Sequence, residues 1–352
     1  MTLLNRYIAR QVFLAVAMVL GLVLCLDFIG KVIDQLESLR ADYNFYEMLV
    51  YIAWSLPRSV YEYLPYAVLV GCLIALGSLA SASELVIVRA AGVSVGRIVW
   101  MVIKPVMLFI VLGVALGEFV IPYADQTAES RRALALGYSS TDQARRGVWH
   151  READEFILFN VIQPDGELFG VSRYRFDGER LLEASFTRRA SYRDGYWQEE
   201  SVAVTEFGAE QISTSERETR RWDTELTPAL LNIVAVEPQT LSISSLRRYT
   251  HYLEDQSLQN TEYALAFWQK LFQPLATASL VLIAISFVFG PLREVSMGQR
   301  IFTGVVFGIG FRLVQSLLGP SSIVFGFSPL IAVLLPIALC FALGVFLLRR
   351  AG

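Results

Sequence analysis

Three charged residues lie within an otherwise apolar stretch near the start of the chain. Asp27, Lys31 and Asp34 fall in the segment 20–36, and their i, i+4, i+7 spacing places them on one face of a helix. Charges at membrane depth are costly and usually point into a helix bundle or a wet cavity. The pattern predicts a face that holds something polar at the edge of a membrane. The alternative is a helix end at the interface, with Lys31 reaching water and Asp34 outside the membrane.

The composition is that of an integral membrane protein. The 352 residues are 54% hydrophobic and 18% charged, and the mean hydropathy is +0.47. A soluble domain carries about a quarter charged residues. The net charge of −3 says little about partners, and nucleic acid is not expected because no basic patch is interleaved with aromatic residues.

Six segments are long enough to cross the bilayer, which takes about 20 apolar residues. The fifth is expected to be the shortest. The segments are 12–36, 57–80, 98–121, 264–289, 301–318 and 328–348.

Arginine in the short loops predicts the orientation. One set of loops and both chain ends carry Arg6, Arg10, Arg89, Arg97, Arg293, Arg300, Arg349 and Arg350. The opposite short loops are poorer and carry Arg40, with Arg58 at the edge of the second span. Both termini are therefore expected in the cytoplasm, and the large middle segment outside it.

The middle segment has the pattern of a β-domain. We expect a sandwich or jelly roll with an open edge, built from several short strands. A polar loop over 210–221 and a helix over 246–253, capped by Ser242 or Ser244, complete it. The expected strands are 156–162, 168–176, 182–192, 197–207 and 222–226.

The predicted fold class is an α-helical membrane protein with six spans and an inserted extracytoplasmic β-jelly-roll-like domain. The predicted divisions are 1–121 for the first three spans, 122–262 for the β-domain with its helical return, and 263–352 for the last three spans.

No catalytic or metal-binding motif is recognisable. The chain lacks a phosphate loop, a zinc-protease motif and a nucleophile elbow. Its three cysteines lie in apolar segments without ligand spacing, and its two histidines are about a hundred residues apart. Neither a catalytic site, a metal nor a cofactor held by this chain is expected.

The stretch 81–92 between the second and third spans predicts a short helix. Ser81 and Glu84 have capping-box spacing, and Gly92 suits a helix end. Leu85 and Val88 would then be exposed on one face. A helix this short is stable only when packed against something. It is either a plain connector or a coupling helix that enters a groove of a nucleotide-hydrolysing subunit.

Arginine occurs at two further informative places. Arg312 lies within the fifth span and should pair with a carboxylate or an anionic ligand, for which Asp27 is one candidate. Arg131 and Arg132 follow the third span and point in different directions on a helix, so one of them is expected to face the bundle. Arginine suits phosphate recognition, although an ordinary solvated surface also explains this pair.

Short motifs along essentially the whole chain resemble the LptF/LptG family of lipopolysaccharide-export ABC transporter permeases, with greater similarity to LptG. No single motif is a strong signal, but together the motifs are specific. The matching stretches are 5–8 (NRYI), 31–36 (KVIDQL), 83–86 (SELV), 91–92 (AG), 117–122 (GEFVIP), 241–244 (LSIS), 268–274 (WQKLFQP), 286–293 (SFVFGPLR) and 297–298 (MG).

The resemblance implies the role and the partners. Such permeases pair with a second, LptF-like permease, an LptB-like cytoplasmic ATPase dimer that binds ATP and Mg, and an LptC-like single-span accessory protein. Together they move lipopolysaccharide from the outer leaflet of the bacterial inner membrane into periplasmic jelly rolls. The large domain would then be periplasmic.

The resemblance also implies three groups of site residues. Lys31 and Arg132 match lipid head-group ligands, with Asp34 and Arg131 beside them. Glu84 matches a coupling-helix carboxylate, within the set Ser83, Glu84, Leu85, Arg89 and Gly92. The lateral gate and cavity would involve Leu24, Asp27, Phe28, Phe307, Phe311 and Arg312.

Asp27 and Arg312 depart from the family pattern, which has uncharged residues there. The counter-ion of Asp27 is either Arg312 or a group on a partner subunit. The competing function is a mechanical signalling permease that couples to an ATPase but moves no lipid, and the charged face of the first span disfavours it.

Overall fold

The computed structural model describes residues 2–39, 43–136 and 148–351, with short gaps at 153, 164–165, 179, 194, 209–210, 225, 229–230, 232–236, 256–259 and 291–294. Arg40 and Arg293, two of the arginines that bear on orientation, lie outside these residues. The chain divides into two compact units. One comprises 1–30, 56–121 and 242–352, and the other comprises 31–55 and 122–241.

Six helices within the described residues are long and apolar enough to span a membrane, which confirms the predicted number. The third continues through a π-helical turn, Leu116–Val120, into α5 (Ile121–Leu136). The six are α1 (Thr2–Leu36), α2 (Phe45–Ser81), α4 (Val95–Ala115), α9 (Thr261–Phe289), α10 (Met297–Phe325) and α11 (Pro329–Ala351).

The prediction that the fifth span is the shortest is wrong. The α10 helix has 29 residues and α11 has 23. Ser296 caps α10 by accepting a hydrogen bond from the Gln299 backbone N–H at 3.4 Å, and Gly326 ends the helix at φ 70°. Both ends therefore lie beyond the apolar stretch by which the span was recognised.

The α2 helix is the central helix of the helical unit. In its most apolar 18-residue stretch 72% of residues are buried, against 22% in α1 and 17% in α10. Small residues let neighbouring helices approach it closely, as expected for membrane helices. A Cβ on Gly113 of α4 would lie 3.3 Å from Leu64, and one on Gly308 of α10 would lie 3.4 Å from Leu69. These glycines therefore let α4 and α10 pack closely against α2.

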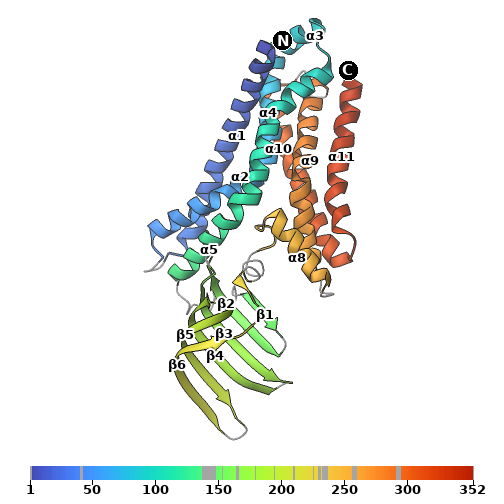
Figure 1. Ribbon diagram of the computed structural model, residues 1–352. Coiled ribbons are helices and arrows are strands. Elements are labelled where there is room, and N and C mark those ends of the chain that lie inside the picture. The colour runs from blue at the N-terminus through green and yellow to red at the C-terminus, as the bar shows by residue number, and fades with distance from the viewer. Residues whose placement is uncertain are drawn as a thin grey trace. The chain divides into compact units, whose positions relative to one another are not determined.

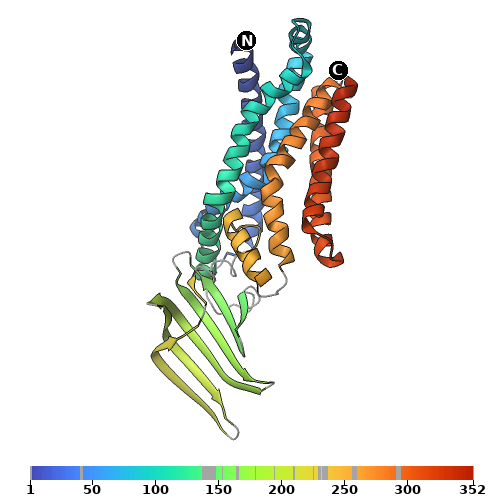
Figure 2. The ribbon, with the colours of Figure 1, turned by 45° about the vertical axis from the view of Figure 1, so that its right-hand side comes forward.

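Both chain ends and the short helix α3 (Glu84–Ala90) lie at one end of the helical unit (Figure 1). The α8 helix (Ile243–Asp255) packs beside α9 in both views (Figure 2). Ser242 caps α8 by accepting a hydrogen bond from the Ser245 N–H at 3.1 Å. Of the two predicted caps, Ser242 and Ser244, the first is therefore confirmed. Glu118, in the π-helical turn, also accepts hydrogen bonds from the first turn of α8, including one from the Ile243 N–H at 2.8 Å.

The middle of the chain forms one antiparallel sheet whose six strands follow their sequence order. Four predicted strands are confirmed, and a first strand was not predicted. The strands are β1 (Val148–Glu152), β2 (Glu155–Ile162), β3 (Leu168–Asp177), β4 (Arg180–Arg193), β5 (Tyr196–Phe207) and β6 (Ile212–Trp222).

The predicted loop over 210–221 is wrong, because most of it is strand β6. The predicted strand over 222–226 is also wrong, because Trp222 is the last residue of β6. The side chains of β6 are exposed except for Arg220 and Trp222 at its end, so no buried face produces an apolar alternation in its sequence. An edge strand of this kind is recognisable only from its pairing, here with β5.

One face of the sheet carries an apolar cluster that continues into a charged network. The cluster is built around Phe159, Trp197 and Trp222, and the Trp197 indole N–H donates to the Leu226 carbonyl at 2.7 Å. Beyond it, Glu199 is fully buried and accepts from Arg220 Nε at 2.6 Å.

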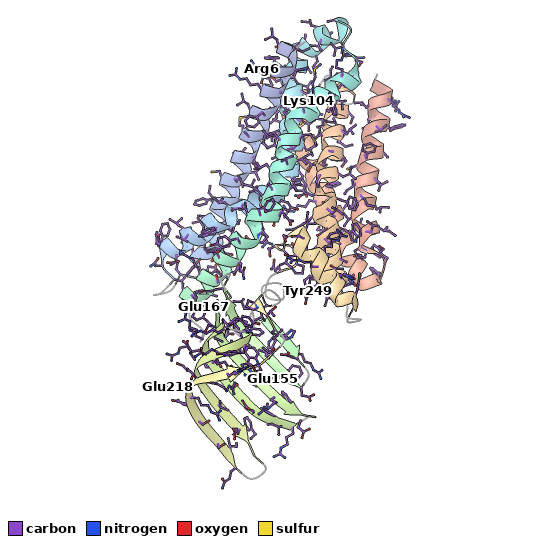
Figure 3. The ribbon with its side chains drawn as sticks, in the orientation of Figure 1. Arg6, Lys104, Glu155, Glu167, Glu218 and Tyr249 are labelled. Carbon is purple, nitrogen blue, oxygen red and sulfur yellow. The ribbon has the colours of Figure 1, made fainter. Side chains whose placement is uncertain are left out.

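The charged network reaches across five strands. Arg173 of β3 pairs with Glu155 of β2 at 2.8 Å and with Glu199 of β5 at 3.3 Å. Glu155 is labelled in Figure 3. Arg220 of β6 pairs with Glu183 of β4 at 2.8 Å. Each charge in this network therefore has an opposite charge within hydrogen-bonding reach, as burial demands.

Candidate functional site

The predicted head-group residues lie on two helices of the unit that contains residues 31–55 and 122–241. Lys31 is half-buried and Asp34 exposed at the end of α1, and on α5 Arg132 is half-buried and Arg131 exposed. The expectation that one arginine of the pair faces inward is confirmed by Arg132. We call Lys31, Asp34, Arg131 and Arg132 the charged rim.

Arg132 is held in place by residues that were not predicted as site residues. Its Nε donates to Gln35 Oε1 of α1 at 3.1 Å, and its guanidinium lies 5.4 Å from the centre of the Tyr51 ring of α2. Tyr51 in turn donates to Glu129 at 3.0 Å. Gln35 belongs to the motif of residues 31–36, which was the one sequence signal for it; nothing local marks Tyr51.

A small apolar core supports the charged rim. Tyr43, Met48 and Ile52 are fully buried and pack with Val32 of α1 and Leu136 of α5. Burial raises the pKa of the Tyr43 hydroxyl, and the nearby positive charge of Arg132 opposes that change. The ends of three helices are thus fixed together, which positions Arg132 against the end of α1.

The predicted gate residues lie on α1 and α10 of the helical unit. Leu24 and Asp27 are half-buried, and Phe28 is exposed. Phe311 is buried, and Phe307 packs edge-on against Phe287 of α9 with ring centres 5.6 Å apart. Phe307 and Phe311 therefore contribute to the core of the helical unit, which places them behind the exposed surface of α10.

The charges of this region are paired through α2. Asp27 accepts hydrogen bonds from Ser59 Oγ at 2.7 Å and Tyr63 Oη at 3.0 Å. The expectation that Arg312 pairs with a carboxylate is confirmed by Glu62, whose Oε2 lies 3.9 Å from Arg312 Nη2. The sequence named Asp27 as one candidate and did not suggest Glu62.

The short helix between α2 and α4 exists, but it begins differently from the prediction. Ser81 belongs to α2 and donates to the Gly77 carbonyl at 2.9 Å, so the predicted capping box with Glu84 is wrong. The helix starts after Ser83, whose φ of 61° turns the chain sharply. Gly92 has a φ of 84°, and its N–H donates to the Arg89 carbonyl at 2.9 Å, as a helix-terminal glycine should.

The exposed face of α3 is also different from the predicted one. Leu85 is only 4% exposed and joins the core, with Val88 packed against it. Val86 and Ile87 are instead 53% and 67% exposed. Glu84 accepts a hydrogen bond from the Tyr7 hydroxyl of α1 at 3.3 Å, which fixes its direction.

A buried arginine of α10 anchors the end of α2. Arg300, only 2% exposed, donates to the Gly77 carbonyl at 2.7 Å and to Ser81 Oγ at 2.9 Å. These acceptors lie directly before α3. The part of the chain that the structure describes contains no group of three or more His, Cys, Asp or Glu side chains arranged to hold a metal ion.

Six spans, a short helix at the end that holds both termini and a charged rim define a multi-pass membrane permease. The family model for the lipopolysaccharide export system permease LptF/LptG matches residues 6–350, so the chain belongs to this family. It is a transport subunit of lipopolysaccharide export rather than a catalytic enzyme.

Curated relatives agree with this assignment. The chain is 35% identical to the lipopolysaccharide export system permease protein LptG of Escherichia coli K12, over 99% of this chain and 98% of the relative. It is 33% identical to the LptG protein of Haemophilus influenzae, with the same coverage of both chains. The predicted resemblance to the family, with greater similarity to LptG, is confirmed, and the family disfavours the signalling permease.

Proposed function

We propose that the chain takes lipopolysaccharide from the outer leaflet of the bacterial inner membrane and passes it toward a periplasmic bridge of β-jelly-roll domains that leads to the outer membrane. The charged rim is the observation that carries this proposal beyond the family assignment. It places Lys31, Arg131 and Arg132 near the ends of membrane helices.

The chemistry of the charged rim suits a phosphorylated lipid head. A guanidinium presents a planar fork of donors that matches phosphate oxygens. Gln35 and Tyr51 hold Arg132 in one position, so less side-chain freedom is lost when it binds an anion. Asp34 orients Lys31 or keeps the rim hydrated.

The acyl chains would lie against the apolar surfaces of α1 and α10. These are the two least buried spans, and α1 exposes Leu22, Leu26 and Ile29 next to Asp27. Leu24, Asp27, Phe28 and Arg312 would line the lateral entry. Phe307 and Phe311 would support it from the core.

The α3 helix would couple transport to ATP hydrolysis. Its exposed Val86 and Ile87 present an apolar surface that fits a groove, with Glu84 and Arg89 as flanking charges. The groove would belong to a cytoplasmic ATPase dimer that binds ATP and Mg, so this chain needs no cofactor of its own. Both termini lie at the same end as α3 (Figure 1), which supports a cytoplasmic location for both. Three spans precede the β-sheet along the chain, so the sheet would then be periplasmic.

Membership of the family supports the remaining proposed partners. A second, LptF-like permease would complete the cavity, and an LptC-like single-span accessory protein would join the assembly. The ATPase would be LptB-like.

Copurification from native membranes tests the proposal. The second permease, the ATPase and lipopolysaccharide should all be identified with the chain by mass spectrometry. An assembled complex without lipopolysaccharide would contradict the proposed substrate.

Glu84→Ala tests the coupling role separately. The variant should fold and reach the membrane but lose ATP-driven lipopolysaccharide release. The matched control is Glu47→Ala, which also deletes a glutamate carboxylate but in the first turn of α2 rather than in α3. Normal assembly and normal release in Glu84→Ala would refute the role of Glu84.

A further inference from the structure

Arg300 of α10 is a buried charged residue that belongs to none of the proposed lipid, entry or coupling sites. Its side chain is 2% exposed. Its Nη1 donates to the Gly77 carbonyl at 2.7 Å and to Ser81 Oγ at 2.9 Å, both in the last turn of α2. Burying a guanidinium costs free energy that an apolar side chain of similar size would not. The hydrogen bonds of Arg300 therefore require an explanation beyond packing.

The backbone of α2 is shaped to receive this guanidinium. A Cβ on Gly77 would lie 3.0 Å from Arg300 Cδ and 3.1 Å from its Nη1, so a larger residue would press on the arginine. The Ser81 hydroxyl also donates to the Gly77 carbonyl, at 2.9 Å. We call Gly77 and Ser81 the α2 seat.

Contacts one helical turn apart continue from the α2 seat along both helices. On each helix the residues that make them are four apart, so they share one face. A Cβ on Gly304 would collide with Leu73, so the two helices are closely packed there. Close-packed contacts of this kind transmit displacement. The contact pairs are Arg300 with Gly77, Gly304 with Leu73 and Gly308 with Leu69.

The α2 seat lies directly before α3. Two residues separate the end of α2 from Glu84, the first residue of α3, and the second of them, Ser83, has a φ of 61°. A residue with a side chain adopts this conformation only where its surroundings hold it there. Leu85 of α3 is 4% exposed and packs in the core. A displacement of α3 is therefore passed to the end of α2, where Arg300 is bound.

We propose that Arg300 is a positioning residue that passes the displacement of α3 during the ATPase cycle to α10. The inference rests on the proposed coupling role of α3. With Arg300 on the α2 seat, α2 and α10 respond to α3 as one piece. Without it, the ATPase would still move α3, but α10 would not follow.

Amide hydrogen exchange tests this transmission directly. It is measured by mass spectrometry on the assembled complex in lipid nanodiscs, without nucleotide and with ATP trapped by vanadate. In the wild type, trapping should change exchange both in α3 and over residues 297–304 of α10. In Arg300→Met the change should persist in α3 and disappear over residues 297–304. A full response of α10 in the variant, or equal loss in α3 and α10, would overturn the proposal.

The folding of Arg300→Met is favoured by the α2 seat itself. The Gly77 carbonyl keeps the hydrogen bond from Ser81 Oγ, so it is not left without a donor. Lipopolysaccharide release per ATP should fall about tenfold, because one hydrogen bond from a charged group has about that weight. The matched control is Arg350→Met, which removes an exposed arginine at the end of α11. Unchanged release per ATP in Arg300→Met, or equal loss in the control, would contradict the proposal.

A second variant disturbs the same contact from α2. Gly77→Ala leaves Arg300 in the sequence but presses on its guanidinium, so release per ATP should also fall. Gly298→Ala is the matched control, because a Cβ there meets nothing within 4 Å. Normal release in Gly77→Ala, or equal loss in Gly298→Ala, would count against the α2 seat.

The two measurements separate this inference from the proposed function. If the wild-type complex releases no lipopolysaccharide, the proposed function fails, and the exchange measurement still decides the role of Arg300. If the wild type releases lipopolysaccharide while Arg300→Met changes neither exchange nor release, the role of Arg300 alone fails.

Discussion

Removing the carboxylate of Glu199 should destabilise the β-sheet. Glu199 is fully buried and accepts from Thr187 Oγ1 at 2.8 Å, Arg220 Nε at 2.6 Å and Arg173 Nη1 at 3.3 Å. Breaking a buried ion pair by removing one partner costs about 3–5 kcal/mol.

The lower end of that range applies to Glu199→Ala. Arg173 keeps Glu155 at 2.8 Å, and Arg220 keeps Glu183 at 2.8 Å and Ser185 at 3.0 Å. Neither guanidinium is left without an acceptor. A loss of about 3 kcal/mol corresponds to roughly a hundredfold increase in the open population of the sheet.

Amide hydrogen exchange, measured by mass spectrometry on the full-length protein in lipid nanodiscs, reports this change. Exchange in β4, β5 and β6 should be about a hundredfold faster in Glu199→Ala, and exchange in α9 should be unchanged. Glu200→Ala is the matched control, since its side chain lies on the other face of the same strand. Equal exchange in Glu199→Ala and Glu200→Ala would refute the reasoning.

Two further predictions concern packing and pH. Gly304→Ala should lower the melting temperature of the purified protein, because the added Cβ meets Leu73 of α2 and overpacking costs about 1–3 kcal/mol; Gly310→Ala, in open space on the same helix, should not. Burial alone would raise the pKa of Glu183, but the hydrogen bond from Arg220 and the charges of Arg175, Arg220 and Arg173 outweigh burial and lower it. The ionised carboxylate therefore stabilises the folded state above its unfolded pKa, and this stabilisation is lost as the pH falls through its folded pKa. Tryptophan fluorescence should accordingly report a shallower loss of stability on acidification in Glu183→Gln than in the wild type, and identical profiles would contradict the assignment.

The sequence was sufficient for the spans and for most of the sheet. Hydropathy and length define a membrane helix because the bilayer imposes both, and alternation defines a strand with one buried face. Strand β6 was not predicted because its side chains are mostly exposed. The ends of α10 were not predicted because they depend on Ser296 and Gly326, which lie outside the apolar stretch.

The site residues were named from the sequence, whereas the residues around them were not. Lys31, Arg132 and Glu84 were named from motifs, and they remain predictions as ligand and coupling residues. The contacts of Arg132 with Gln35 and Tyr51, and of Glu84 with Tyr7, join different helices. Single-sequence patterns do not report contacts between helices. The same limit explains why Glu62 was not named for Arg312, and why Leu85 was expected to be exposed although it packs into the core.

The central claim is that the charged rim binds the phosphorylated head of lipopolysaccharide. A photo-crosslinking residue in place of the exposed Asp34, one helical turn from Lys31, should form a lipopolysaccharide adduct in the assembled, active complex. The adduct should decrease in Arg132→Met, and the same crosslinker at the exposed Met18 of α1 should form much less of it. An active complex that forms no adduct at position 34, or equal adducts at positions 34 and 18, would contradict the account.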